Sequence, residues 1–249
     1  MDDPIHQFNI VKYIVLGHIG GHEIAVTNSA LFMAIAVLGI SLLLIGATHR
    51  QSLVPGRLQS LAEMSYEFVA DTINSTAGKE GMRFFPFVFS LFMFILFMNL
   101  IGLIPYTFTV TSHIVITASL ALMVFLTVIV YGFWRNGIGF LKLFVPSGIP
   151  IIILPLVTAI EVMSFLSRPI SHSVRLFANM LAGHITLKVF GGFVAMLAAW
   201  GIAGWIGAAV PLALTIALTA LELLVAVLQA YVFAILTCIY LNDTIHPGH

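Results

Sequence analysis

The sequence predicts an all-α, polytopic membrane protein, and its composition, apolar stretches and uneven distribution of basic residues support this fold class. Of its 249 residues, 60% are hydrophobic and only 8% are charged, with a mean hydropathy of +1.10. Soluble domains carry about 25% charged residues, so these charges are too few to cover a water-exposed surface. Several apolar stretches reach the roughly 20 residues that a helix needs to cross a bilayer.

The first half of the chain predicts three separate spans. Residues 1–28 form an N-terminal segment that precedes the first span, which is expected at 29–48. A helical hairpin follows at 84–134, with its two spans at 84–105 and 114–134. The N-terminus is acidic and has no short apolar core behind a positive region, so it does not resemble a cleaved signal peptide.

The second half, 144–241, is apolar with scattered polar side chains. Each of its two halves exceeds one perpendicular span, so each predicts two short spans or one long, tilted helix. The natural break between the halves is Gly191-Gly192.

Basic residues predict the orientation. They lie in two loops, four before the second span and two after the third: Arg50, Arg57, Lys79, Arg83, Arg135 and Lys142. By the positive-inside rule the loops 49–83 and 135–143 face the cytoplasm or its equivalent. The N-terminus is then outside, and the C-terminus is inside if the last two stretches cross once each.

The segment 57–76 predicts an amphipathic helix in the membrane interface. Apolar residues recur at helical spacing, while Glu63, Glu67 and Asp71 share another face. This acidic strip has two interpretations: a solvated face that keeps the helix flat, or a docking strip for a basic partner.

Ionisable side chains interrupt the last two apolar stretches, and they are the candidate functional residues. They are Glu161, Arg168, His172, Arg175, His184, Lys188 and Glu222, joined by the amides Asn179 and Gln229. Glu161, Arg168 and Arg175 are spaced by sevens, which predicts a polar ladder along one helix face that includes His172 and Asn179. His184 falls half a turn from Arg175 on a straight helix, and Glu222 and Gln229 share a face of the final helix.

Arg175 carries the strongest functional signal, because a permanent charge at membrane depth costs from about 2.5 to more than 10 kcal/mol. Two opposite charges near mid-membrane on consecutive helices indicate an ion path, although Arg175 and Glu222 could instead form a structural ion pair. Arg168 and Lys188 could reach toward the interfaces. His172 could bind a backbone carbonyl or a serine, and Asn179 could hold two helices together.

Other functions lack their motifs. No basic block suggests nucleic-acid binding, and the single Cys238 allows no internal disulfide. The sequence contains neither a two-histidine zinc-protease motif nor a phosphate-binding glycine loop. His172 and His184 share one helix and the final helix offers no imidazole, so bis-histidine haem ligation is disfavoured. No cofactor is therefore expected.

Three motifs resemble the a subunit of F-type ATP synthases. They are Glu161-Val162-Met163-Ser164-Phe165-Leu166-Ser167-Arg168-Pro169-Ile170-Ser171, Arg175-Leu176-Phe177-Ala178-Asn179-Met180 with Ala182-Gly183-His184, and Leu228-Gln229-Ala230-Tyr231-Val232-Phe233. The likeness extends from the first span to the C-terminus, and the His184 and Glu222 pair is similar to the mitochondrial and alphaproteobacterial arrangement.

The resemblance implies about five membrane spans plus one interfacial helix, the last two helices being long, strongly tilted and packed against a rotor ring. The implied partners are the ring of proteolipid c subunits, b-type subunits of the peripheral stalk, the remainder of the synthase, and membrane lipid. The implied location is a bacterial inner membrane or, alternatively, the mitochondrial inner membrane, and the chain alone is not expected to be catalytic.

The resemblance also implies roles for the candidate residues. Arg175 faces the carboxylate of each passing ring subunit, favours its ionised form and blocks a leak between two half-channels. His184 and Glu222 form a proton relay on the outer side, with Asn179 and Gln229 steadying Arg175 or ordering water. Glu161, with Arg168 beside it, is the candidate for the exit path.

Two other functions stay open. A self-contained proton or cation transporter should show internal repeats and discontinuous helices in both halves, and no such repeat is visible. A quinone- or haem-binding respiratory subunit is the third hypothesis, which a reduced-minus-oxidised spectrum would test.

Overall fold

A computed structural model describes residues 10–19, 22–49, 54–104, 107–145, 150 and 152–245. Within these residues five helical stretches are long and apolar enough to cross a membrane, which confirms the all-α polytopic class. Their bounds are Asn28–His49, Arg57–Gly102, Ile114–Phe144, Leu154–Ala198 and Gly204–Ile245.

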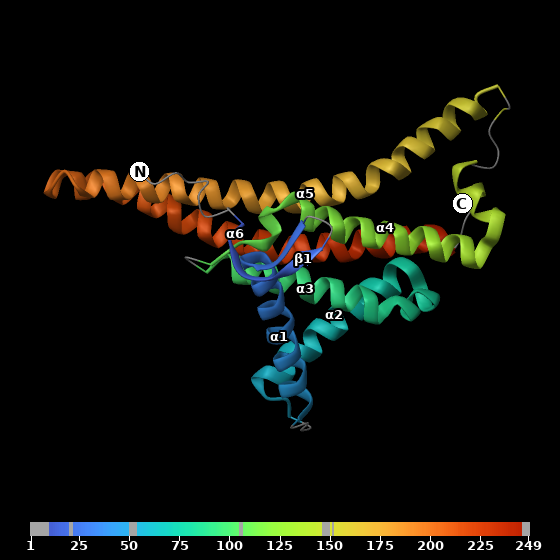
Figure 1. Cartoon of the computed structure of the whole chain (residues 1–249), viewed down its shortest axis with the longest axis horizontal. Helices are drawn as coiled ribbons and strands as arrows, with labels where there is room; N and C mark the ends of the chain where they lie inside the picture. Colours follow the sequence, from blue (N-terminus) through green and yellow to red (C-terminus); the bar gives the residue numbers. More distant parts are fainter. Residues whose placement is uncertain are drawn as a thin grey trace. The chain divides into compact units, whose positions relative to one another are not determined.

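The N-terminal segment contains an element that the sequence analysis did not anticipate. Strands β1 (Lys12–Ile19) and β2 (His22–Thr27) pair antiparallel and lead into helix α1 (Asn28–His49) (Figure 1). A 2.6 Å ion pair joins Lys12 to Glu23 across the strands. The hydrogen bond and charge of Lys12 lower the pKa of Glu23.

The middle of the chain follows the predicted order with longer helices. Helix α2 (Arg57–Gly81) extends beyond the predicted 57–76 and is kinked at Gly78, whose φ is +65°. A short 3-10 turn, η2 (Met82–Phe84), leads into α3 (Phe85–Gly102).

The second arm of the hairpin also differs from its prediction in length. The 3-10 turn η3 (Val110–Ser112) precedes α4 (Ile114–Asn136), which ends two residues beyond the predicted span. The predicted loop 135–143 is largely the 3-10 helix η4 (Gly137–Phe144).

The last two apolar stretches are one continuous helix each, α5 (Leu154–Ala198) and α6 (Ile202–Ile245). The prediction of a break at Gly191-Gly192 was wrong, because α5 continues through both glycines. Two glycines cost a helix about 1 kcal/mol each, whereas leaving backbone groups unpaired in an apolar medium costs more. The chain turns instead at Gly201, whose φ of +79° lies in the left-handed region that glycine tolerates.

The helices divide into two units. Unit 1 comprises residues 1–40, 94–113 and 176–229, and unit 2 comprises residues 41–93, 114–175 and 230–249. In unit 1 the first half of α1 packs near the segment after α3, where the rings of Phe32 and Phe108 lie 6.3 Å apart. The Asn99 side-chain amide of α3 donates to the Ala226 carbonyl of α6 at 3.2 Å.

Aromatic and polar contacts hold unit 2 together. Phe68 of α2 contacts Phe92 of α3 and Tyr231 of α6, at ring separations of 5.7 and 5.2 Å. Phe125 of α4 contacts Phe165 of α5 at 5.0 Å. At the ends of the helices, Arg135 pairs with Glu80 at 2.6 Å, and Asn136 donates to the Thr244 carbonyl at 2.7 Å.

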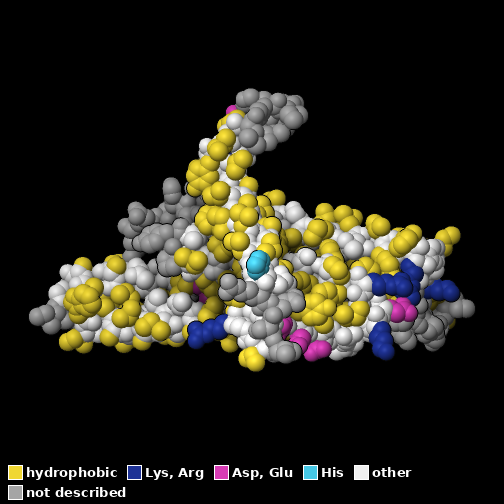
Figure 2. Space-filling view, turned by 90° about the horizontal axis from the view of Figure 1, so that it is seen from below, with side chains coloured by type: hydrophobic (Ala, Val, Ile, Leu, Met, Phe, Trp, Pro, Cys, Tyr) yellow, Lys and Arg dark blue, Asp and Glu magenta, His cyan; other side chains and the backbone are white. Residues whose placement is uncertain are grey.

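Large apolar side chains remain exposed on the transmembrane helices, as expected for surfaces that face lipid. Leu42 of α1, Val130 of α4 and Ile216 of α6 are each more than 60% exposed. Hydrophobic atoms cover much of the face shown in Figure 2, with few charges among them. Extensive apolar exposure is typical of surfaces that contact a membrane or another protein.

Candidate functional site

Unit 1 brings together the two residues expected to form a relay. Nδ1 of His184 on α5 lies 3.6 Å from Oε1 of Glu222 on α6. The Glu222 residue is 6% exposed, and neither carboxylate oxygen hydrogen-bonds a described atom. A carboxyl group therefore faces an imidazole in largely apolar surroundings, where either can take up or release a proton.

Gly183 allows this close approach. A Cβ added at position 183 would lie 2.7 Å from Glu222 Oε1, closer than real Cβ contacts, and 3.1 Å from its Cδ, closer than most of them. The Glu222 carboxylate thus occupies the space that a larger residue on α5 would fill. The sequence alone offered no reason to select Gly183, since glycines are frequent along this chain.

A threonine that the sequence analysis missed completes this cluster. Thr109 Oγ1 lies 3.0 Å from His184 Nε2 and 3.4 Å from the Gly102 carbonyl oxygen. Thr109 lies just before η3, in the loop between the two arms of the predicted hairpin. It is 3% exposed, so its hydroxyl is a buried partner of the imidazole.

Other buried polar atoms of unit 1 lack hydrogen-bond partners among the described residues. They are Asn99 Oδ1, Thr111 Oγ1 and His113 Nε2. Burial lowers the pKa of His113, which lies just before α4, and favours its neutral ring. Buried polar groups without partners are rare in proteins and often mark functional regions.

Asn179 and Gln229 also belong to unit 1. Asn179 is half-buried on α5, and Gln229 is 6% exposed on α6. Arg175 belongs to unit 2, so their pairing with Arg175 stays a prediction.

In unit 2 Arg175 is exposed on α5, and no ion pair or hydrogen bond to it is found among the described side chains. One turn before it on the helix, Ser171 is also exposed, whereas His172 is buried. The guanidinium therefore emerges on an exposed face of α5.

Arg168 forms an ion pair with an acidic residue of α6. Its Nη1 lies 2.7 Å from Asp243 Oδ2, and its guanidinium carbon lies 4.8 Å from the Tyr240 ring centre. Both charges are partly buried, and the pairing joins α5 to the last turn of α6. The sequence analysis missed Asp243 because pattern arguments within one helix cannot identify a partner 75 residues away.

His172 and Glu161 are the remaining ionisable residues of the predicted polar ladder. The residues of this ladder differ in burial, because His172 is buried, Glu161 is half-buried and Arg175 is exposed. His172 is 4% exposed, and its ring lies edge-on to Phe233 of α6 with ring centres 3.8 Å apart. The Phe233 backbone is the nearest polar partner of the ring, although neither ring nitrogen makes a hydrogen bond of good geometry to a described residue. Glu161 is half-buried near the start of α5.

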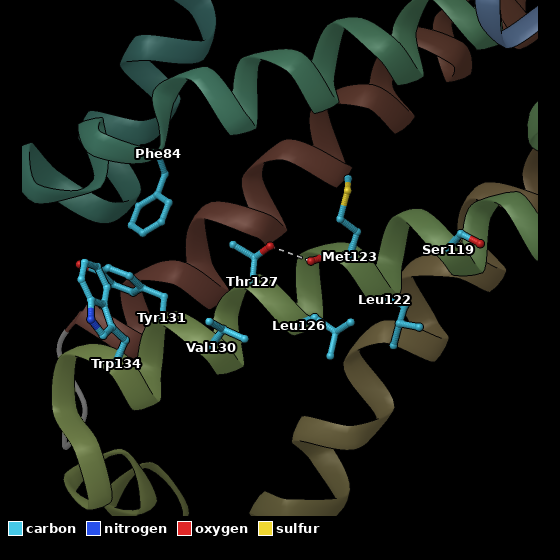
Figure 3. Close-up of a pocket in the computed structure, with 9 residues that line it drawn as sticks. All are labelled: Phe84, Ser119, Leu122, Met123, Leu126, Thr127, Val130, Tyr131 and Trp134. Atoms are coloured by element: carbon cyan, nitrogen blue, oxygen red, sulfur yellow. Dashed lines mark hydrogen bonds between the residues drawn. The ribbon is translucent and has the colours of Figure 1, made fainter.

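A groove of about 600 Å³ opens on unit 2 and is distinct from these residues. Phe84 and eight residues of α4 between Ser119 and Trp134 line it (Figure 3). Its lining contains no ionisable group other than the Tyr131 phenol, and the Thr127 hydroxyl is bonded to the Met123 carbonyl at 2.8 Å. The groove therefore offers an apolar surface rather than acid–base chemistry.

The described residues contain no group of three or more His, Cys, Asp or Glu side chains that could hold a metal ion. The arrangement instead offers the His184–Glu222 pair in unit 1 and the exposed guanidinium of Arg175 in unit 2. These groups can bind, release and repel protons without a cofactor.

The chain is similar to known membrane proteins over its whole length. The ATP synthase A chain family matches residues 30–242. The chain is 70% identical over 249 residues to ATP synthase subunit a of Rhodopseudomonas palustris strain BisB18, covering 100% of both proteins. It is 70% identical over the same coverage to that of Nitrobacter winogradskyi, and 67% identical to that of Bradyrhizobium diazoefficiens with 99% of each covered.

Proposed function

Because the chain belongs to the ATP synthase A chain family, we propose that it carries protons through two half-channels that Arg175 separates. The chain is a multi-pass protein of a bacterial inner membrane and a proton-translocating stator component of the F-type ATP synthase. The half-channels, the role of each residue and the contacting subunits are the proposal. The chain has no catalytic role by itself in this mechanism.

The observation that carries the proposal is the 3.6 Å approach of His184 and Glu222. A proton entering from the outer side binds the imidazole, passes to the carboxylate and continues to a ring carboxylate. Carboxyl and imidazole groups both exchange protons reversibly, so one can pass a proton to the other. Asn179 and Gln229 steady Arg175 or order water.

Arg175 serves as the barrier in this mechanism. Its positive charge favours ionisation of an approaching ring carboxylate, which releases its proton to the exit side. The guanidinium cannot lose its own proton and therefore cannot pass one directly between the half-channels. This separation is needed because a proton crossing 100 mV releases about 2.3 kcal/mol, which a leak would dissipate.

The lengths of α5 and α6 support the expected tilt. At 1.5 Å per residue, 45 and 44 residues extend about 68 and 66 Å, more than twice the roughly 30 Å hydrocarbon core. Helices this long and apolar stay within the core only when they tilt strongly. When both helices tilt, α5 and α6 can contact a neighbouring ring of c subunits along much of their length.

On the exit side we assign Glu161 as the proton-accepting group near the start of α5. Arg168 and Asp243 neutralise each other at 2.7 Å, so their pairing holds α5 against α6. His172 packs beside this contact against Phe233 and Tyr240 and supports the same helix pair.

Helix α2 is proposed as the contact for b-type stalk subunits. Its acidic residues Glu63, Glu67 and Asp71 are exposed, while Val69 and Ile73 on another face are buried. A basic segment of the stalk would complement this strip, whereas a purely solvated face would need no partner.

A self-contained transporter is the weaker alternative. It would need to pair or enclose Arg175 within the chain, whereas this guanidinium is exposed and has no ion pair among the described residues. In the proposed complex another subunit covers Arg175, which explains why it is exposed in this chain.

Cross-linking tests the contact with the ring. Val174→Cys, beside Arg175, should form a disulfide with a cysteine in the outer helix of the c subunit, in a Cys238→Ser background. Leu126→Cys, equally exposed but on the groove side of α4, is the matched control and should not form one. Cross-linking at Leu126 but not at Val174 would place the ring elsewhere and overturn the proposal.

The predicted orientation is tested by labelling from each side of sealed vesicles. Because the loop 49–83 is expected inside, Lys79→Cys should react with a membrane-impermeant maleimide only from the cytoplasmic side. Tyr13→Cys in β1 should react only from the outside and serves as the opposite control. Both variants use the Cys238→Ser background, and outside labelling at position 79 would refute the topology.

A further inference from the structure

We infer that Thr109 is a positioning residue of the proton path, holding the His184 ring so that its Nδ1 accepts protons on the side of Glu222. This inference rests on the proposed function, because it concerns how the His184–Glu222 pair transfers a proton. All of the residues involved belong to unit 1.

The geometry places one group at each nitrogen of the ring. Thr109 Oγ1 lies 3.0 Å from Nε2, and Glu222 Oε1 lies 3.6 Å from Nδ1. Two nitrogens with different partners are chemically distinct, because the hydrogen bond made by one determines which of them carries the proton in the neutral ring.

The Gly102 carbonyl favours one direction for the hydrogen bond between Thr109 and His184. The Thr109 hydroxyl has one proton, and the Gly102 carbonyl at 3.4 Å can only accept it. With that proton directed at Gly102, the threonine oxygen accepts from Nε2–H of His184. The neutral imidazole then has its lone pair at Nδ1, directed toward Glu222.

This tautomer lets the ring return to its starting state after each proton. An incoming proton binds at Nδ1 and gives the imidazolium, in which Nε2–H still donates to Thr109. The Nδ1 proton then passes to the Glu222 carboxylate, which becomes a neutral carboxylic acid as the ring becomes neutral. Thr109 keeps its own proton throughout, so it orients the relay without joining it.

The opposite tautomer would interrupt this cycle. A ring protonated at Nδ1 would give that proton to Glu222 and receive its replacement at Nε2. Each transfer would then leave the ring in the other tautomer, and the ring would have to rotate before the next proton. The Thr109 contact removes this step.

The local fold keeps Thr109 in place. A Cβ added at Gly102 would lie 2.9 Å from Thr109 Cγ2, so only glycine allows the segment to approach the end of α3 this closely. The Ser112 hydroxyl donates to the Thr109 carbonyl at 2.6 Å and fixes the turn that follows. These contacts before and after Thr109 hold its hydroxyl beside His184.

The test separates the hydroxyl of Thr109 from its shape. Thr109→Val keeps the volume and removes the hydroxyl, whereas Thr109→Ser keeps the hydroxyl and removes a methyl group. Proton-driven ATP synthesis per assembled complex should fall roughly tenfold in the valine variant, the lower end of the loss when a histidine loses its orienting partner. The serine variant should stay within about twofold of wild type.

Thr107→Val is the matched control, because among the described residues the Thr107 hydroxyl bonds only the backbone carbonyls of Ile101 and Ile104, at 2.6 and 2.7 Å. It should retain near wild-type synthesis per assembled complex. Equal losses in Thr109→Val and Thr109→Ser, or wild-type synthesis in Thr109→Val, would overturn the inference. Glu222→Gln is measured alongside: normal synthesis there would refute the relay itself, whereas a loss there with normal Thr109→Val would refute only the role of Thr109.

Discussion

Arg175→Ala should abolish proton-driven ATP synthesis while leaving assembly of the complex largely intact. The guanidinium is exposed and makes no ion pair with a described side chain, so its removal leaves no buried charge uncompensated. A unit charge 4 Å from a carboxylate contributes about 4 kcal/mol at an effective dielectric constant of 20, or about a thousandfold in ionisation. Without it the ring carboxylate should fail to release its proton, and the barrier between the half-channels should open.

Arg175→Lys should also couple poorly, because a desolvated lysine can lose its proton and lacks the planar fork. The measurements are ATP synthesis and passive proton leakage in vesicles containing equal amounts of assembled complex. Arg83→Ala removes an exposed cation from η2, outside the proposed path, and is the matched control. Synthesis by Arg175→Ala vesicles at near wild-type rates would contradict the proposed barrier.

Glu222→Gln is expected to have the second-largest effect, because it keeps the side-chain shape and removes the titrating group. Proton flux per assembled complex should fall by about two orders of magnitude, the range that a positioned proton-transfer group contributes. Glu222→Asp should retain part of the flux, since the carboxylate remains but is drawn back from His184. Flux and the amount of complex are measured in the same membranes.

A structural role for Glu222 predicts a different result. Glutamine would then reduce the amount of assembled complex, and each assembled complex would conduct normally. The exchanged variant, Glu222→His with His184→Glu, tests whether the two side chains act as a pair. Flux above that of either single variant would support one shared path, because residues in contact show coupled effects.

The membrane-spanning helices could be predicted from the length of the apolar stretches, whereas the residues at which the helices begin and end could not. Apolar stretches of sufficient length predicted the spans, since a bilayer requires a minimum helix length. Gly191-Gly192 was misassigned as a break because glycine ends helices in water, where exposed backbone groups find other partners. The N-terminal hairpin lay outside these patterns because hydropathy over a span does not detect short strands.

The candidate site was predictable in its residue types but not in its partners. His184 and Glu222 stood out as ionisable groups in apolar sequence, and the structure places them together. Thr109 and Asp243 could not be selected, because a threonine in a loop and an acidic residue at a helix end are ordinary alone. Their significance arises from contacts across 75 residues of sequence, which no local spacing contains.

The missing side chain at Gly183 restricts how this protein can change over evolutionary time. Small residues are usually interchangeable between transmembrane helices, so alanine or serine would be a neutral replacement at most glycines that only pack. At position 183 even one methyl group would collide with the Glu222 carboxylate. A displacement of about 1 Å at a reacting group can cost about a hundredfold in rate. We therefore expect natural variation at this position to be limited by the need to keep Glu222 within proton-transfer distance of His184. Packing between the two helices should limit it less.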